Sequence, residues 1–283
     1  MATFQTGYKA RRIASKTAIY IILLFVAAVC LVPFLWMVST SLKSSKAIFL
    51  YPPQWIPNPP NWRNYYDTWT IVPFGTFFRN TVTIAVLCTV GTIIASSLAA
   101  FGFARLKFKG RGFLFAVMLA TMMIPWEITA VPLYVEFKFL GWIDTLKPLI
   151  VPSFFGSAFN IFLLRQFLYS VPYDLDEAAL IDGCGPFRTF FRVILPQLPP
   201  VTASVAILTG VTCWNDYQFS IYILSKQNPV ATITQAVSGF FQQVNSDAYG
   251  AAAAALLGVL PIIALFLLLQ RYFIQGMVDS AIK

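Results

Sequence analysis

The stretch AIYIILLFVAAVCLVPFLWMV, residues 18–38, decides the fold class because it contains 21 consecutive uncharged residues. A transmembrane helix needs about 20 mostly apolar residues to cross the hydrocarbon core of a bilayer. A secretory signal peptide has an apolar region of only about 7–15 residues, followed by a small-residue cleavage site. Residues 18–38 form a longer run without such a site after it, so we expect a retained membrane-spanning helix.

Five more apolar runs follow along the chain. They comprise residues 81–103, 112–126, 148–164, 199–214 and 251–270. The run 112–126 has only 15 residues before Glu127, which is short for a transmembrane helix. The whole chain is 58% hydrophobic and 11% charged, whereas soluble domains average about 25% charged residues. These features predict an all-α membrane protein with six transmembrane helices.

The basic residues predict the orientation of the chain. It carries 20 Lys and Arg against 11 Asp and Glu, a formal net charge of +9. In a soluble protein such an excess can indicate a nucleic-acid partner, but in a membrane protein Lys and Arg accumulate in cytoplasmic loops. If the N-terminus is cytoplasmic, 13 of the 20 lie in residues 1–17, 104–111, 165–198 and 271–283. We therefore expect both termini in the cytoplasm, contact with membrane lipid and no nucleic-acid partner.

The apolar runs and the charges together predict five parts of the chain. The segment between the first two runs is rich in Pro, Trp and Tyr, and such aromatic residues are typical of the membrane interface. The expected parts are a cytoplasmic N-terminal tail (1–17), the first transmembrane helix (18–38), an extracytoplasmic Pro/Trp-rich loop (39–80), a core of five transmembrane helices (81–275) and a cytoplasmic tail (276–283).

The long cytoplasmic loop 165–198 lies within this core and predicts a helix-turn-helix hairpin. Asp174 and Glu177 have the spacing of a capping box that would start the first helix. Gly183 is the residue type that ends helices in the left-handed conformation, and Pro186 is tolerated in the first turn of a second helix. The second helix carries an apolar stripe at helical spacing. Its members are Phe187, Phe190, Phe191 and Ile194.

Three interpretations of this hairpin are open. It can dock into a groove on a soluble partner, form a catalytic acidic cluster, or lie against the bilayer as a re-entrant hairpin. The acidic residues that would form the cluster are Asp174, Asp176, Glu177 and Asp182. The chain has no His, no second acidic motif and no nucleophile pattern, so we expect that it is not an enzyme.

The sequence EAALIDGCGPFRTFFRVILP, residues 177–196, resembles the EAA loop of the permease subunits of ATP-binding-cassette (ABC) importers. Four further segments resemble the carbohydrate-uptake branch of this family, in particular its second permease, the type of the maltose-system G subunit. They are residues 122–145, 159–183, 214–216 and 261–278. The resemblance therefore extends over most of the chain and implies a permease core.

The resemblance also implies partners. A permease of this kind forms half of a translocation pore with a second homologous permease in the inner membrane. Two ATP-binding-cassette ATPase subunits lie beneath the pore, and an extracytoplasmic substrate-binding protein delivers the solute. The residues expected to couple to the ATPase are Glu177, Ala178, Ala179, Asp182 and Gly183; the alternative is that they only cap and turn the hairpin.

The chain lacks a GxxxxGK[ST] phosphate loop. We therefore expect ATP and Mg²⁺ to bind the partner ATPase, and no cofactor or metal in this chain.

Trp214, Asn215 and Asp216 are candidates for the translocation path. Asn215 and Asp216 interrupt the fifth apolar run near its outer end, and an ionisable residue there usually faces a cavity or the bundle interior. The alternative is that they cap an ending helix. The following outer loop, 224–249, predicts an amphipathic helix. Its apolar residues are Ile233, Val237, Phe240, Phe241 and Val244.

The leading hypothesis is a permease subunit for a sugar or an oligosaccharide. The same role for another solute, such as glycerol phosphate, is the alternative within this class. A secondary transporter would need inverted repeats and intramembrane carboxylates, and a structural membrane scaffold would not need the EAA loop.

Overall fold

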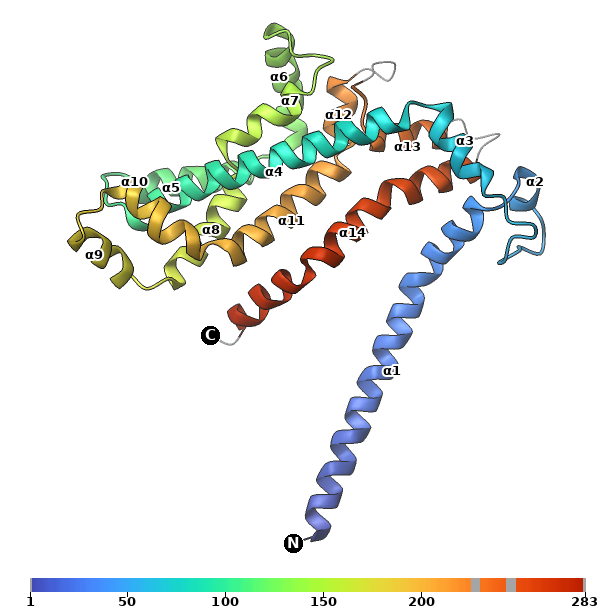
Figure 1. Ribbon diagram of the computed structural model, residues 1–283, viewed down its shortest axis with the longest axis horizontal. Helices are drawn as coiled ribbons and strands as arrows, with labels where there is room; N and C mark the ends of the chain where they lie inside the picture. The colour runs from blue at the N-terminus through green and yellow to red at the C-terminus, as the bar shows by residue number, and fades with distance from the viewer. Residues whose placement is uncertain (1, 225–229, 243–247, 282–283) are drawn as a thin grey trace. The chain divides into compact units, whose positions relative to one another are not determined.

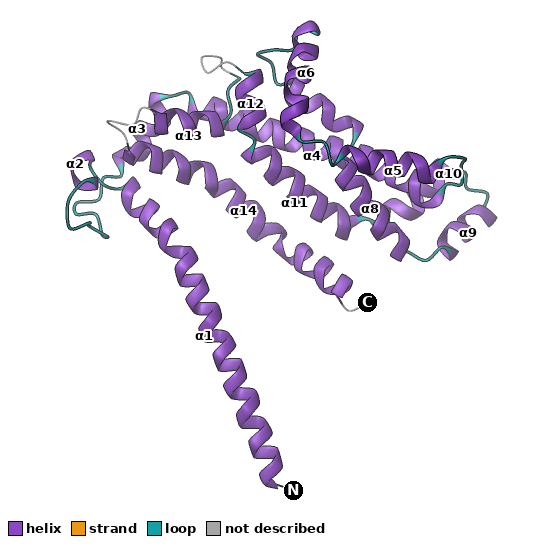
Figure 2. Cartoon of the chain, turned by 180° about the vertical axis from the view of Figure 1, so that it is seen from behind, coloured by secondary structure: helices purple, strands orange, loops and turns teal. Residues whose placement is uncertain are grey.

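The computed structural model describes residues 2–224, 230–242 and 248–281 (Figure 1). Within these ranges the chain consists of helices and loops and contains no strand (Figure 2). The predicted all-α class is therefore confirmed. The chain divides into two compact units, one of residues 1–70 with 240–256 and one of residues 71–239 with 257–283.

Four helical segments of the described chain are long and apolar enough to cross a membrane. They are Ser15–Ser41, Phe74–Arg105, Lys147–Ser170 and Tyr249–Leu268. Two further pairs of helices qualify only together, because each is sharply bent: Arg111–Thr121 with Trp126–Phe139 at 94°, and Pro186–Gln197 with Pro199–Asn215 at 79°. The described chain thus has six spans, as predicted, if each bent pair counts as one.

The first unit contains helix α1 (Ala2–Ser41), the short helix α2 (Ser45–Ile48) and most of α3 (Arg63–Ile71). The Pro- and Trp-rich segment folds back on the end of α1. Ser39 Oγ donates to the Trp55 carbonyl at 2.6 Å, and the rings of Trp36 and Trp55 meet edge to face with centroids 5.1 Å apart. Buried Asn64 donates to the Ser41 carbonyl at 2.8 Å. This segment is therefore an ordered loop.

The second unit is organised around α4 (Phe74–Arg105), which packs along α8 (Ala158–Ser170) and α11 (Pro199–Asn215). Gly91 allows α4 to approach the 3₁₀ turn before α8 closely, since a Cβ added at Gly91 would lie 2.7 Å from the Phe154 ring. The core between these helices is apolar. Its buried residues are Ala100, Phe101, Ile161, Leu164, Leu168, Phe190, Ile194, Leu198, Val201 and Val205.

Six further helices of the described chain, besides those of residues 174–189, complete the element order. They are α5 (Arg111–Thr121), α6 (Trp126–Phe139), α7 (Lys147–Ile150), α12 (Gln218–Ile223), α13 (Ile233–Gln242) and α14 (Ala248–Ala281). A 3₁₀ turn, Val151–Phe155, links α7 to α8. The structure has the predicted helix of the outer loop as α13, with Ile233 and Phe240 buried; Val244 lies outside the described residues.

Candidate functional site

The loop that follows α8 folds as a helical hairpin, as predicted. Its first arm is α9 (Asp174–Ile181), which ends at Gly183 with a φ of 74°. The Gly183 N–H donates to the Leu180 carbonyl at 3.0 Å, and the Cys184 N–H donates to the Ala179 carbonyl at 2.9 Å. These are the two hydrogen bonds of a Schellman motif. The prediction that Gly183 ends the helix in the left-handed conformation is confirmed.

The capping box predicted at Asp174 is wrong. Asp174 is the first residue of α9, and the N-cap position belongs to Tyr173, whose side chain makes no capping hydrogen bond. Asp174, Asp176 and Glu177 all lie in the first turn of α9. Carboxylates in this position are stabilised by the positive end of the helix dipole. The local spacing could not distinguish this placement from a side-chain cap.

The second arm begins as predicted and then departs from the prediction. Pro186 starts α10 (Pro186–Thr189), but a π turn (Phe190–Ile194) and a 3₁₀ turn (Leu195–Gln197) follow. These turns have different numbers of residues per turn, so the expected stripe does not stay on one face. Phe190 and Ile194 are buried, whereas Phe187 and Phe191 are exposed. The prediction of one continuous apolar face is wrong.

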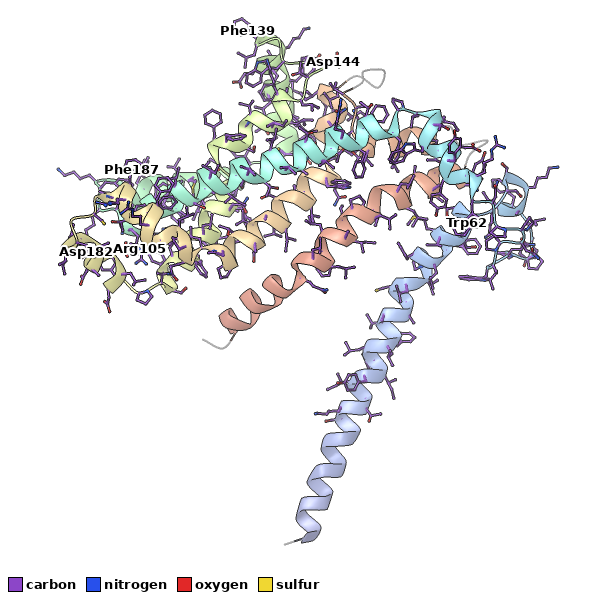
Figure 3. The ribbon with its side chains drawn as sticks, in the orientation of Figure 1. Trp62, Arg105, Phe139, Asp144, Asp182 and Phe187 are labelled. Atoms are coloured by element: carbon purple, nitrogen blue, oxygen red, sulfur yellow. The ribbon has the colours of Figure 1, made fainter. Side chains whose placement is uncertain are left out.

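The tip of the hairpin presents a mixed acidic and apolar surface. Of the predicted coupling residues, Glu177, Ala178, Asp182 and Gly183 are exposed, and Ala179 is buried. Sequence reasoning missed two large apolar side chains on the same hairpin, Leu180 and Ile181, which are 73% and 86% exposed. Phe187, expected in the apolar stripe, is 76% exposed. Figure 3 labels Asp182, Phe187 and Arg105 in this region. Large exposed apolar groups beside charged ones mark an interaction surface.

Arg105, the last residue of α4, holds the connection that leads into α9. Its Nε lies 3.3 Å from Asp176 Oδ2, with the two side chains only 6% and 12% exposed. Its Nη2 donates to the Val171 carbonyl at 2.7 Å, and its guanidinium carbon lies 5.5 Å from the Tyr173 ring centroid. One side chain therefore contacts three points of the segment 171–176. The sequence had identified Arg105 only as one of the inner basic residues.

A second arginine ties α8 to the same end of α4. Arg165 Nε donates to the Phe103 carbonyl at 3.3 Å. Its guanidinium carbon lies 3.8 Å from the Phe115 ring centroid in α5 and 4.7 Å from that of Tyr169, which are cation–π distances. One side chain of α8 thus contacts both α4 and α5.

Burial raises the pKa of the Asp176 carboxyl above its ordinary value, while the positive charge of Arg105 acts in the opposite direction. A buried carboxylate loses hydration that an ion pair returns only in part. The net upward direction means that desolvation outweighs the attraction between the two charges.

The candidate path residues occupy the end of α11. Trp214 is buried, and its Nε1 donates to the Gly258 carbonyl in α14 at 3.0 Å. Asn215 is exposed. Asp216 Oδ1 accepts a hydrogen bond from the Phe219 N–H at 3.2 Å, which is the capping contact of the alternative interpretation. The role of these residues in a path stays a prediction.

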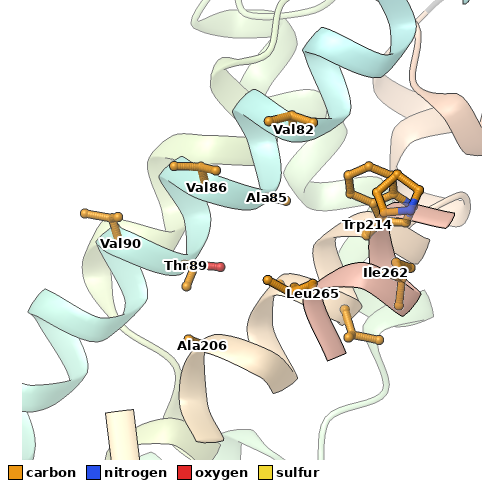
Figure 4. Close-up of a pocket in the computed structure, with 12 residues that line it drawn as sticks. Val82, Ala85, Val86, Thr89, Val90, Ala206, Trp214, Ile262 and Leu265 are labelled. Atoms are coloured by element: carbon orange, nitrogen blue, oxygen red, sulfur yellow. The ribbon is translucent and has the colours of Figure 1, made fainter. Parts of the chain in front are cut away.

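A cavity of about 320 Å³ lies between α4, α11 and α14 (Figure 4). Its lining residues are Val82, Ala85, Val86, Thr89, Val90, Ala206, Gly210, Val211, Trp214, Pro261, Ile262 and Leu265. Only Thr89 and Trp214 among them carry a polar side-chain atom, and the Trp214 N–H is already used. Such a lining suits acyl chains or helix packing better than a hydroxylated solute, which requires convergent polar groups.

No group of three or more His, Cys, Asp or Glu side chains in the described part of the chain could hold a metal ion.

Comparison with known proteins then decides the family. Residues 91–279 match the family described as the binding-protein-dependent transport system inner membrane component. The chain belongs to this family. It is a permease subunit of a binding-protein-dependent ABC importer and an inner-membrane protein, and ATP binding belongs to a separate ATPase.

Named relatives agree with this assignment. The melibiose/raffinose/stachyose import permease MelC of Bacillus subtilis is 36% identical, with 97% of this chain and 99% of the relative aligned. The diacetylchitobiose uptake permease NgcG of Streptomyces coelicolor is 32% identical over 88% and 83%. The sn-glycerol-3-phosphate transport permease UgpE of Pectobacterium atrosepticum is 33% identical over 83% and 86%.

The fold is also that of a solved transporter. The crystal structure of a bacterial ABC transporter involved in the import of the acidic polysaccharide alginate contains a chain that matches with a TM-score of 0.79. The two chains are 21% identical, and the match covers 90% of this chain and 95% of the other.

Proposed function

We propose that this permease subunit imports a sugar or an oligosaccharide and forms half of the translocation pore with a second, homologous permease. The names of MelC and NgcG, which align over most of this chain, support a carbohydrate. A substrate-binding protein on the outer side would supply the solute. UgpE supports glycerol phosphate as the second candidate at comparable identity.

The exposed tip of the hairpin is the observation that supports coupling of this chain to the ATPase. Glu177 and Asp182 offer carboxylates, Ala178 and Gly183 offer close approach, and Leu180 with Ile181 offers apolar area. A groove with basic rims and an apolar floor on one ATPase subunit fits this surface. The hairpin is the contact through which closure of the two ATPase subunits reaches the membrane helices.

The contact is tested by co-purification of the ATPase with the tagged permease complex. We expect Glu177→Arg or Gly183→Pro to release the ATPase, because the first reverses a charge at the tip and the second breaks the turn. Glu136→Arg, the same change at an exposed carboxylate of α6, is the matched control and retains it. Full retention of ATPase by both hairpin variants contradicts the proposal.

The solute is tested on the cognate substrate-binding protein. Raffinose, diacetylchitobiose and sn-glycerol-3-phosphate are the probes, and calorimetry is the readout. Binding of a saccharide supports the leading proposal. Selective binding of sn-glycerol-3-phosphate replaces it with the second candidate.

Asn215, Asp216 and Trp214 remain the candidate path residues, because they lie at the outer end of α11 and Asn215 is exposed. Asn215→Ala removes the polar side-chain groups at an exposed position. We expect it to slow uptake of the solute identified by the binding screen, while Asp216→Asn, which keeps an oxygen for the Phe219 N–H, preserves the local turn. Unchanged uptake in Asn215→Ala contradicts a path role for this residue.

A further inference from the structure

Arg105 gives α9 a direct connection to a membrane-spanning helix. Its side chain binds Asp176 within α9, the Val171 carbonyl before α9 and the ring of Tyr173 between them. Arg105 itself ends the 32-residue helix α4. A movement of α9 can therefore reach α4 without passing through the intervening helix α8.

The helix α9 has few other connections to the unit. Among its eight residues only Ala179 is buried. At one end α9 joins the short segment Val171-Pro172-Tyr173, and at the other it joins the turn at Gly183, where added side-chain atoms would meet nothing within 4 Å. Apart from that side chain, α9 is held by its contacts with α10 and the π turn of the same hairpin and by two short linkers. A two-turn helix held in this way can tilt unless a further contact fixes it.

Stability of the fold does not explain the ion pair. The Arg105 and Asp176 side chains are 6% and 12% exposed, and neither Nε nor Oδ2 makes a hydrogen bond in the described structure. Desolvation outweighs their attraction, since burial raises the pKa of Asp176 despite the adjacent charge. Pairs of this kind can be replaced by apolar residues without loss of stability, and their attested use is to fix one geometry.

We propose that Arg105 is a positioning residue that makes α9 and the cytoplasmic end of α4 move as one body when the ATPase binds ATP. The inference rests on the proposed function, because α9 must contact the ATPase for the connection to transmit anything. It adds that the force enters the membrane at α4, through Arg105 and Asp176.

Double electron–electron resonance (DEER) spectroscopy tests the connection between α9 and α4 in the purified complex of this chain, the second permease and the ATPase. Spin labels are placed at Asp174→Cys in α9 and Leu98→Cys in α4, both exposed positions, on a background with the four native cysteines replaced by alanine. Distances are compared without nucleotide and with ADP and vanadate. We expect one narrow distance distribution that is the same in both states.

The Arg105→Ala variant should keep the ATPase but lose the fixed distance. With ADP and vanadate its distribution shifts or broadens by roughly 1–2 Å or more, the size of helix shifts at interfaces. Asp176→Asn removes the charge with the smallest change in side-chain shape and should show the same change as Arg105→Ala. The double variant Arg105→Asp with Asp176→Arg should restore the narrow distribution. Lys107→Ala, which removes an exposed cation two residues away, is the matched control and changes nothing.

The outcomes separate this inference from the coupling role of the hairpin. An unchanged narrow distribution in Arg105→Ala and Asp176→Asn overturns the inference, as does a nucleotide-dependent shift in the labelled parent. Neither result affects the docking contact, which fails only if Glu177→Arg and Gly183→Pro retain the ATPase.

Discussion

Arg105 Nε and Asp176 Oδ2 lie 3.3 Å apart and join the end of α4 to the first turn of α9. The pair is the buried junction between a membrane-spanning helix and the exposed hairpin. Both groups are largely shielded from water. A substitution at either position can therefore change the stability of the protein and, separately, the position of α9.

Removing one partner should destabilise the protein more than replacing both. Arg105→Ala leaves the Asp176 carboxylate buried without its counter-charge, which costs about 3 kcal/mol. Arg105→Met combined with Asp176→Leu removes both charges at similar volume and should be nearly neutral. Thermal unfolding of the purified complex in detergent measures the difference. Equal losses in both variants contradict this reading of the pair.

Acidification should break the pair at a pH above that at which an ordinary Asp protonates. Burial raises the pKa of Asp176, so the carboxylate is lost early as the pH falls from neutral. Protein stability changes with pH in the opposite direction to the ion pair. Because the folded-state pKa of Asp176 is raised, the folded state binds the proton more tightly than the unfolded state does. The contribution of Asp176 to the free energy of unfolding therefore decreases as the pH rises through this window.

The spin-label distance between positions 174 and 98, followed from pH 7 downward, reports loss of the pair. A transition in the parent that is missing in Asp176→Asn assigns it to this carboxyl. A transition that is identical in both contradicts the assignment.

The turn of the hairpin offers a matched pair of glycines. Gly183 has a φ of 74°, whereas Gly185 has a φ of −73°, and neither has an atom within 4 Å of an added Cβ. Gly183→Ala should therefore cost about 1 kcal/mol through backbone strain alone, and Gly185→Ala almost nothing. If the hairpin docks on the ATPase, the affinity of the permease for the ATPase should fall about fivefold in Gly183→Ala and stay unchanged in Gly185→Ala. Equal affinities of the two variants for the ATPase would contradict a role of the Gly183 turn in docking.

The packing of α4 can be tested in the same way. A Cβ at Gly91 would lie 2.7 Å from the Phe154 ring, whereas one at Gly102 on the same helix meets nothing within 4 Å. Gly91→Ala should destabilise the protein by about 1–3 kcal/mol through overpacking. Gly102→Ala should be neutral or slightly stabilising, since alanine favours helix. Thermal unfolding distinguishes them, and equal midpoints contradict the close approach.

Sequence reasoning succeeded where the determining interactions are local. The apolar runs depend on composition over about 20 residues, so they predicted the spans. Gly183 and Pro186 act through their own backbone geometry, so their positions in the hairpin were also predictable. Glu177, Asp182 and Gly183 were predicted as coupling residues and are exposed in the structure, although their contact with an ATPase is still a proposal.

The failures share a dependence on distant parts of the chain. The stripe of Phe187 and Phe191 with Phe190 and Ile194 assumed a regular helix, but packing against the α4–α8–α11 core introduces a π turn. The run 112–126 is not one straight helix, because α5 and α6 meet at 94°. The contact of Arg105 with Asp176 joins positions 71 residues apart, and no local pattern contains it.

The mass of the purified complex, measured by native mass spectrometry, tests the central claim most directly. The account predicts one copy of this chain, one second permease and two ATPase subunits, with at least one ATPase copy lost in Glu177→Arg and both copies kept in Glu136→Arg. A complex without ATPase, or one that keeps both copies in Glu177→Arg and Gly183→Pro, contradicts the account.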